Sequence, residues 1–199
     1  MGLWSRIFAA AYDPMVARAE RAGIAKERCT LLGGVRGRVL EIGAGTGLNV
    51  EHYPPGSDVV YTEPDVHMAR RLRARGAEVV AAGAERLPFA DDSFDTVVST
   101  LVLCTVRDVP ASLREIRRVL VPGGRLLFLE HVRADPGSKL ERWQDRLHGP
   151  WHALAGGCNC NRDLLGSLGA ESFSVVELRH ETWSFMPRIV RPVVIGIAS

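Results

Sequence analysis

Hydrophobic and polar positions along the chain predict short strands that alternate with helices. Mostly apolar runs of strand length occupy residues 38–42, 58–63, 78–81, 93–100 and 125–132. Residues 65–76 predict a helix with a basic outer face, and another helix begins at Asp108 and stops before Pro122-Gly123-Gly124. This alternation is typical of a parallel sheet covered by helices on both faces.

The two ends of the chain break this alternation. The apolar stripe of an amphipathic N-terminal helix consists of Leu3, Trp4, Ile7, Phe8, Ala11 and Met15. We expect Pro14 to end this helix and a second helical stretch to cover residues 16–25. Residues 173–178 and 191–198 predict two strands joined by a turn. The whole pattern predicts an α/β fold: a doubly wound, mostly parallel sheet of seven strands with helices on both faces and a C-terminal antiparallel hairpin.

Composition excludes several classes of partner. The 199 residues include 25 basic and 23 acidic side chains and only 7% aromatic ones, which argues against a nucleic-acid partner. Four cysteines, at positions 29, 104, 158 and 160, are too unevenly spaced for a disulfide scaffold and favour a reducing, cytoplasmic location. No apolar window reaches the roughly 20 residues of a membrane span. The N-terminal helix is therefore the one candidate for a weak, peripheral membrane contact, and no obligate protein partner is evident.

A glycine-rich loop follows the first strand. Glu41-Ile42 leads directly into Gly43-Ala44-Gly45-Thr46-Gly47 and an expected helix. Backbone N–H groups then lie at the carboxyl edge of the sheet, where doubly wound folds bind ligands. The dinucleotide-binding pattern requires a third glycine at position 48, where this chain has Leu48. For the loop alone, a simple tight turn is the alternative interpretation.

Two later segments favour a ligand that contains adenosine. Glu63 ends the second strand 20 positions after Gly43, where a carboxylate accepts hydrogen bonds from both ribose hydroxyls. Residues 83–89 follow the third strand and bring backbone N–H groups and the Glu85 carboxylate toward the adenine edge.

Taken together, these motifs resemble the class I S-adenosylmethionine-dependent methyltransferases, which have a Rossmann-like fold. The resemblance covers residues 37–133 and rests on the loop and Glu63, on Leu87-Pro88-Phe89 ahead of Phe94-Asp95, and on residues 118–124. It implies S-adenosyl-L-methionine as the cofactor and S-adenosyl-L-homocysteine as the product. The cofactor-binding residues predicted in this way are Tyr12, Glu41, Gly43, Ala44, Gly45, Glu63, Pro64, Ala84, Glu85, Thr100 and Leu101.

The parts of the cofactor are divided among these residues. The resemblance implies that Glu41 and the glycine turn hold the methionine part, Glu63 the ribose, and Ala84 with Glu85 the adenine. Many family members have Asp where this chain has Gly83, which shifts the adenine contact to Glu85 or to the backbone.

A narrower resemblance concerns the methyl acceptor. The segments 100–104, 130–132, 150–152 and 157–159, with Arg162, are similar to the methyltransferase-like thiol S-methyltransferases, which methylate small thiols at membranes. A small thiol is therefore the preferred acceptor. The alternatives are C- or O-methylation of a quinone-like or phenolic small molecule and, from another class, a non-catalytic cofactor-binding protein.

Two histidines are the candidate catalytic residues. His131 lies at the end of the fifth strand, at the same edge as the glycine loop, and is the first candidate for a proton acceptor or a hydrogen bonder to the acceptor. A strand-end histidine bonded to backbone is the alternative. His152 lies in the segment before the final hairpin, where substrate-binding elements of this fold lie, and packing in a helix is the alternative there.

Other reactive side chains receive ordinary interpretations. The pair Cys158 and Cys160 lacks the second ligand pair of a zinc site, so no metal is expected. Cys104 is interpreted as a small buried hydrophobic residue. The basic helix at 70–75 is interpreted as a solvated face.

The expected organisation is one methyltransferase domain, 1–199. It comprises an N-terminal helical lid (1–30), a cofactor-binding core (37–133), an acceptor-site insert (134–170) and a C-terminal hairpin (171–199). In the lid, Tyr12 and Asp13 are expected to close over the cofactor.

Overall fold

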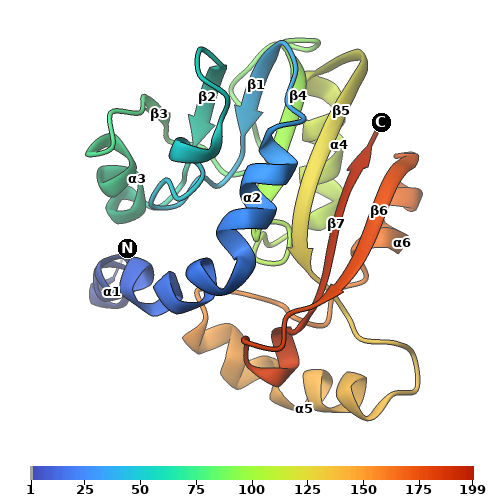
Figure 1. Cartoon of the computed structure of the whole chain (residues 1–199). Coiled ribbons are helices and arrows are strands. Elements are labelled where there is room, and N and C mark those ends of the chain that lie inside the picture. Colours follow the sequence, from blue (N-terminus) through green and yellow to red (C-terminus); the bar gives the residue numbers. More distant parts are fainter. Residues whose placement is uncertain (1) are drawn as a thin grey trace.

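Seven strands form one sheet in the order β3-β2-β1-β4-β5-β7-β6 (Figure 1). The computed structural model describes residues 2–199, so only Met1 of the expected N-terminal lid lies outside the described residues. Strands β1 to β5 run parallel, and β7 is antiparallel to both of its neighbours. The predicted fold is confirmed. The strands are β1 (Arg38–Glu41), β2 (Asp58–Thr62), β3 (Val79–Val80), β4 (Phe94–Thr100), β5 (Leu120–His131), β6 (Val175–Thr182) and β7 (Pro192–Ala198).

Helices cover both faces of this sheet. They are α1 (Leu3–Ala19), α2 (Ala25–Leu32), α3 (Val66–Arg73), α4 (Val109–Val119), α5 (Lys139–Leu154) and α6 (Leu164–Ala170). Short helical turns at Glu20–Ile24, Val50–His52 and Arg188–Val190 complete the set. In Figure 1, α1 and α5 lie at the edge where the parallel strands end, so they are placed to cover a ligand at that edge.

The alternation of side chains along the central strands explains the two layers of helices. Successive strand residues point to opposite faces. Accordingly, Leu126 and Phe128 of β5 pack with α4 and α6, whereas Leu127 and Leu129 pack with the α2 residues Leu31 and Leu32. Both faces are therefore apolar, as a parallel sheet requires.

The chain order reverses between two neighbouring strands. β1 pairs with β2 on one side and with β4 on the other. In doubly wound sheets this position opens a crevice at the carboxyl ends of the strands. The glycine loop at 43–47 leaves β1 at that position.

Two expectations about helices are wrong. Pro14 does not end the first helix; it lies within α1, and the irregularity comes later, at the π-helical turn Glu20–Ile24 around Gly23. Pro14 and Ala10 are both exposed, so water can replace the hydrogen bond that the proline removes. No α-helix follows the glycine loop either, but only the 3₁₀ turn Val50–His52, because Pro54 and Pro55 come after Tyr53 and prevent its extension.

Candidate active site

The glycine loop can adopt its path only with glycine at key positions. Gly43 and Gly47 have positive φ angles of 54° and 86°. An added Cβ would lie 2.5 Å from the side chain of Val102 at the first position and 2.6 Å from that of Leu72 at the second. Any other residue at positions 43 and 47 would be strained and would clash with these side chains. Glycine therefore allows the loop to pack closely against Val102 and Leu72.

A small cavity lies beside this loop. Its lining includes seven of the predicted cofactor-binding residues: Tyr12, Glu41, Gly43, Ala44, Gly45, Thr100 and Leu101. Four further lining residues were not predicted: Arg28, Thr46, Leu48 and Asn49. The structure therefore brings the N-terminal helices, the β1 loop and the end of β4 together around one space.

A buried polar network forms the floor of the small cavity. The Glu41 carboxylate accepts hydrogen bonds from Asn49 Nδ2 (3.0 Å) and from the Tyr53 hydroxyl (2.6 Å). Asn49 Nδ2 also donates to Thr100 Oγ1 (2.8 Å). Burial is the largest influence on Glu41 and raises its pKa to about 7. This carboxylate therefore changes its charge near neutral pH.

Arg28 adds a positive charge to this network. Its guanidinium donates to Asn49 Oδ1 (2.8 Å) and to Thr100 Oγ1 (3.0 Å), and it pairs with Glu20 at 3.1 Å. The side chain is buried although arginine is rarely so. No motif contains Arg28 or Asn49, so nothing in the sequence distinguishes them from ordinary polar residues of a helix and a loop.

Glu63 lies where the sequence predicts it, at the end of β2. One carboxylate oxygen accepts from Gly45 N and the other from Asp65 N, both at 2.8 Å. Each oxygen keeps a further lone pair for a ligand hydroxyl. Burial raises the pKa of Glu63, although the two backbone hydrogen bonds oppose this effect.

The remaining predicted cofactor residues lie outside the lining of the small cavity. Pro64 is exposed beside Glu63, and Ala84 is part of the hydrophobic core. The Glu85 carboxylate accepts a hydrogen bond from Arg107 N at 2.8 Å and so links the segment after β3 to the segment after β4.

The Asp13 carboxylate fastens helix α1 beside the small cavity, and Ser5 of the same helix donates to Asp65. Asp13 accepts from Thr46 Oγ1 (2.5 Å), Arg71 (3.1 Å) and Arg75 (3.2 Å). Burial raises the pKa of Asp13, but the hydrogen bonds from Thr46 and Arg71 prevail, so the net shift is downward. Arg71 and Arg75 of the predicted basic helix thus serve this contact. Arg70, Arg73 and Arg75 are exposed, in agreement with the interpretation of a solvated face.

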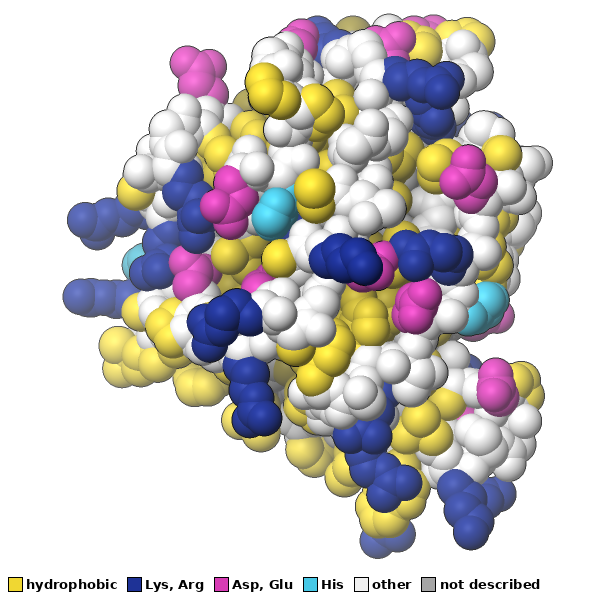
Figure 2. Space-filling view, viewed as in Figure 1, with side chains coloured by type: hydrophobic (Ala, Val, Ile, Leu, Met, Phe, Trp, Pro, Cys, Tyr) yellow, Lys and Arg dark blue, Asp and Glu magenta, His cyan; other side chains and the backbone are white. Residues whose placement is uncertain are grey.

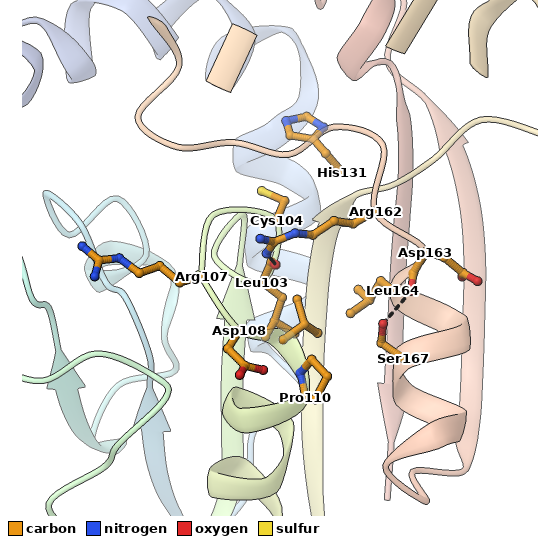
Figure 3. Close-up of a pocket in the computed structure, with 11 residues that line it drawn as sticks. Leu103, Cys104, Arg107, Asp108, Pro110, His131, Arg162, Asp163, Leu164 and Ser167 are labelled. Atoms are coloured by element: carbon orange, nitrogen blue, oxygen red, sulfur yellow. Dashed lines mark hydrogen bonds between the residues drawn. The ribbon is translucent and has the colours of Figure 1, made fainter. Parts of the chain in front are cut away.

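A second, larger cavity of about 360 Å³ lies between β5 and the starts of α4 and α6 (Figure 3). It is lined by Leu103, Cys104, Arg107, Asp108, Val109, Pro110, His131, Arg162, Asp163, Leu164 and Ser167. The segment after β4 separates the two cavities: Thr100 and Leu101 line the small one, and Leu103 and Cys104 line the large one.

His131 stands at one end of the large cavity with a free ring nitrogen. Its side chain is buried, and Nδ1 has no hydrogen-bond partner within the described part of the chain. The backbone of Val190 favours the charged ring and so opposes the effect of burial on the pKa of His131. Burial lowers the pKa of His131 to about 4. At neutral pH the imidazole is thus uncharged, with Nδ1 unpaired within the described residues.

His152 does not reach either cavity. It is exposed on α5, and its ring lies against that of His148 with the centroids 5.7 Å apart. The structure therefore does not bring the two predicted catalytic histidines together.

Three of the four cysteines are buried among apolar side chains. Cys104, Cys158 and Cys160 share a buried apolar cluster, and all four cysteines are free thiols. Among residues 2–199, no group of three or more His, Cys, Asp or Glu side chains is arranged to hold a metal ion.

Comparisons with known proteins agree with this geometry. Residues 40–128 match the family described as Methyltransferase domain. Human thiol S-methyltransferase TMT1A is 40% identical over 169 residues, which cover 80% of this chain and 69% of the human protein. Demethylmenaquinone methyltransferase from Mycobacterium sp. (strain KMS) is 43% identical over 107 residues, 53% of this chain and 46% of that protein.

A solved structure supports the fold. A SAM-dependent methyltransferase of Thermotoga maritima, described as a possible histamine N-methyltransferase, superposes with a TM-score of 0.74 at 22% identity, covering 98% of this chain and 96% of the other. The human relative is similar over more than two thirds of its length, and this similarity shows that the two proteins belong to one family. The chain is therefore an S-adenosylmethionine-dependent methyltransferase and belongs to the family of human thiol S-methyltransferase TMT1A.

Proposed function

We propose that this enzyme transfers the methyl group of S-adenosylmethionine to the sulfur of a small thiol. The observation that carries the proposal is the 40% identity to human thiol S-methyltransferase TMT1A over 69% of that protein. The cavity of about 360 Å³ supports it, because sites for small ligands measure about 300–1,000 Å³.

The residues of the small cavity fit the methionine end of the cofactor. An ammonium group pairs with the Glu41 carboxylate, and a carboxylate pairs with Arg28, which is already held beside Thr100. The positive φ angles of the glycine turn let the backbone approach a ligand closely. We assign the ribose hydroxyls to Glu63 with the neighbouring Pro64, and the adenine to the segment around Ala84 and Glu85.

The cofactor supplies an electrophilic methyl group on a sulfonium. The enzyme has to align the acceptor about 3 Å from this carbon and exclude water. A thiol with a pKa near 8.5 needs no strong base to become a nucleophile. This modest requirement matches the larger cavity, whose described lining includes His131, a neutral histidine with an unpaired Nδ1.

We propose that His131 orients the acceptor. In this proposal Nδ1 of the neutral ring accepts a hydrogen bond from the S–H group and so orients the sulfur. The ring has a pKa of about 4 and does not hold the thiol proton, which is released to bulk solvent. The new carbon–sulfur bond forms as the old one breaks, and the electron pair stays on the homocysteine sulfur. We assign no role to His152.

A panel of acceptors tests the proposal. The enzyme is incubated with trideuteromethyl-labelled S-adenosylmethionine and alkyl thiols, phenols, quinols or amines, and the products are identified by mass spectrometry. We expect labelled thioethers and S-adenosylhomocysteine in equal amounts. Turnover of phenols or quinols without thiols would contradict the thiol assignment.

The mycobacterial relative favours a second candidate acceptor. That protein is named for demethylmenaquinone, a quinone. C- or O-methylation of a quinone-like or phenolic molecule is therefore the alternative, and the same panel distinguishes it. If the cofactor binds but no acceptor of any class is methylated, the non-catalytic alternative applies.

We propose that α1 is a lid over the small cavity. That cavity measures about 50 Å³ with Tyr12 and Arg28 in its wall, whereas cofactor-sized ligands occupy several hundred Å³. In this proposal α1 moves to admit the cofactor, and the irregular turn at Glu20–Ile24 is its hinge.

We also propose that the protein is cytoplasmic and that the outer face of α1 makes a peripheral membrane contact. Leu3 is 73% exposed and Trp4 52% exposed, and Figure 2 shows hydrophobic side chains over α1 below the basic side chains of the neighbouring region. No helix among residues 2–199 has the length and apolar character needed to cross a bilayer.

Deleting residues 2–12 distinguishes the lid role of α1 from the membrane contact. Weaker cofactor binding in solution supports the lid, and loss of liposome binding alone supports the membrane contact.

A further inference from the structure

A buried carboxylate at the end of β5 gathers four hydrogen bonds and takes no part in the methyl transfer described so far. Glu130 is fully buried. One oxygen accepts from Ser99 Oγ (2.6 Å), Val102 N (2.9 Å) and Leu103 N (3.0 Å), and the other accepts from Cys104 N (3.1 Å). All four partners donate, so the group acts as a carboxylate and not as an acid that needs an acceptor of its own.

The segment that Glu130 holds has a backbone that does not form by itself. Leu101 ends β4 through its N–H bond to Leu129 O (2.8 Å) and then adopts a φ of 61°. A leucine disfavours this left-handed conformation, so surrounding interactions have to maintain it. Three consecutive N–H groups after Leu101 converge on one carboxylate, which is such an interaction.

The opposite side of the same segment is held by the insert. Arg162 donates to Leu103 O (2.6 Å) and to Val106 O. Asn159 donates to Cys104 O twice, from its backbone N (2.7 Å) and from its side chain (3.0 Å). Three N–H groups of this segment thus go to Glu130, and three of its carbonyls accept from Arg162 and Asn159.

This segment is the wall between the two cavities. Thr100 and Leu101 face the small cavity, and Leu103 and Cys104 face the large one. A shift of the segment therefore changes both the cofactor site and the acceptor site. Figure 3 shows Arg162 lying across Leu103 within the large cavity.

We propose that Glu130 is a positioning residue for methyl transfer, which together with Arg162 and Asn159 fixes residues 101–106 in the shape that both cavities require. Glu130 itself touches neither ligand. The inference rests on the proposed function, because it assigns the two cavities to cofactor and acceptor.

The variant Glu130→Gln tests this role. The amide keeps the size of the side chain but turns an N–H₂ group toward an N–H donor of the segment. Hydrogen exchange, measured by mass spectrometry on the ligand-free protein, is expected to speed up at least about tenfold in residues 101–106, and the Kd of S-adenosylmethionine is expected to rise about tenfold. The KM of the acceptor rises as well.

A matched control separates positioning from general stability. Thr96 lies at the opposite end of β4 and makes two hydrogen bonds, with Arg36 N (3.1 Å) and Arg36 O (2.8 Å). Thr96→Val removes both, so its Tm is expected to fall while the exchange of 101–106, the Kd and the KM stay at the wild-type values.

The outcomes decide the proposal. Wild-type exchange in 101–106, or a Kd within twofold of wild type, in folded Glu130→Gln would overturn it, as would equal changes in Thr96→Val. If Glu130→Gln does not fold, Arg162→Lys replaces it, with the same exchange measurement and the same criteria for support or rejection. Because exchange needs no ligand, a failure here is distinct from a failure of the proposed function, which would appear as a wild-type enzyme that methylates no thiol.

Discussion

At the scale of single residues, the site is built on carboxylates that are buried next to hydrogen-bond donors. Glu41, Glu63 and Glu130 each end a parallel strand or lie next to its end, and burial raises the pKa of each. A buried carboxylate is costly unless it is satisfied, and all three accept hydrogen bonds. Of the three, Glu41 is the one whose raised pKa, about 7, lies near neutral pH.

Glu41 makes cofactor binding dependent on pH. Its pKa is raised from 4.5 to about 7 in the ligand-free chain, and a cationic ammonium prefers the ionised form. The affinity for S-adenosylmethionine is therefore expected to rise as the pH increases from about 6 to about 8, with proton release. Titration calorimetry in buffers of different ionisation enthalpy measures this release.

Glu41→Gln is the control for this effect. It should bind the cofactor more weakly and without proton release. The same shift destabilises the ligand-free chain as the pH rises, because the stability that protonated Glu41 contributes is complete below about 4.5 and is lost as the pH passes about 7. A wild-type affinity that is flat across this neutral range contradicts the assignment of Glu41.

His131 is expected to affect turnover but not cofactor affinity. His131→Phe keeps the ring volume and removes the Nδ1 acceptor, so kcat/KM for a thiol should fall roughly 10- to 100-fold. Since burial lowers the pKa of His131 to about 4, the wild-type pH profile should follow the ionisation of the thiol, with no step from the histidine near neutral pH. If the affinity for S-adenosylmethionine fell as much as kcat/KM, the assignment of His131 to the acceptor site would be contradicted.

At the scale of elements, α1 differs most from its prediction. The periodic apolar stripe indicated a helix correctly, but the effect of Pro14 depends on whether the freed carbonyl meets water, which the sequence does not reveal. The expected helix after the glycine loop is wrong for a different reason, which the sequence does contain: Pro54 and Pro55 allow only one turn, Val50–His52.

The Asp13 contact is expected to control the lid. Asp13→Ala removes the hydrogen bonds from Thr46, Arg71 and Arg75 that fasten α1. We expect faster exchange of the α1 amides and a several-fold higher Kd for S-adenosylmethionine. Glu171→Ala is the control, because it breaks the exposed pair with Arg114 away from α1. An unchanged Kd in Asp13→Ala would argue against the lid.

At the scale of the whole molecule, lid, core, insert and hairpin are expected to form one cooperative domain. Glu130, Arg162 and Asn159 link the core to the insert, and β7 pairs with β5. Calorimetry should therefore show a single unfolding transition, and S-adenosylmethionine should raise the Tm of this transition without splitting it. Two separate transitions would contradict a single domain.

The sequence predicts the sheet and the glycine loop because both are encoded in local patterns. It does not predict Arg28 or Asn49, because a polar residue acquires its role only when α2 and the β1 loop meet over β4. His152 illustrates the converse: a plausible position in the chain, yet an exposed side chain on α5. Sequence motifs therefore indicate the class of ligand, whereas the tertiary fold determines which other side chains surround it.

A crystal structure with S-adenosylhomocysteine tests the central claim most directly. We expect the homocysteine carboxylate at Arg28, the ribose at Glu63, and the sulfur facing past Leu101 and Cys104 toward His131. A sulfur that faces away from the cavity of about 360 Å³, or a ribose that does not reach Glu63, would contradict the proposed arrangement.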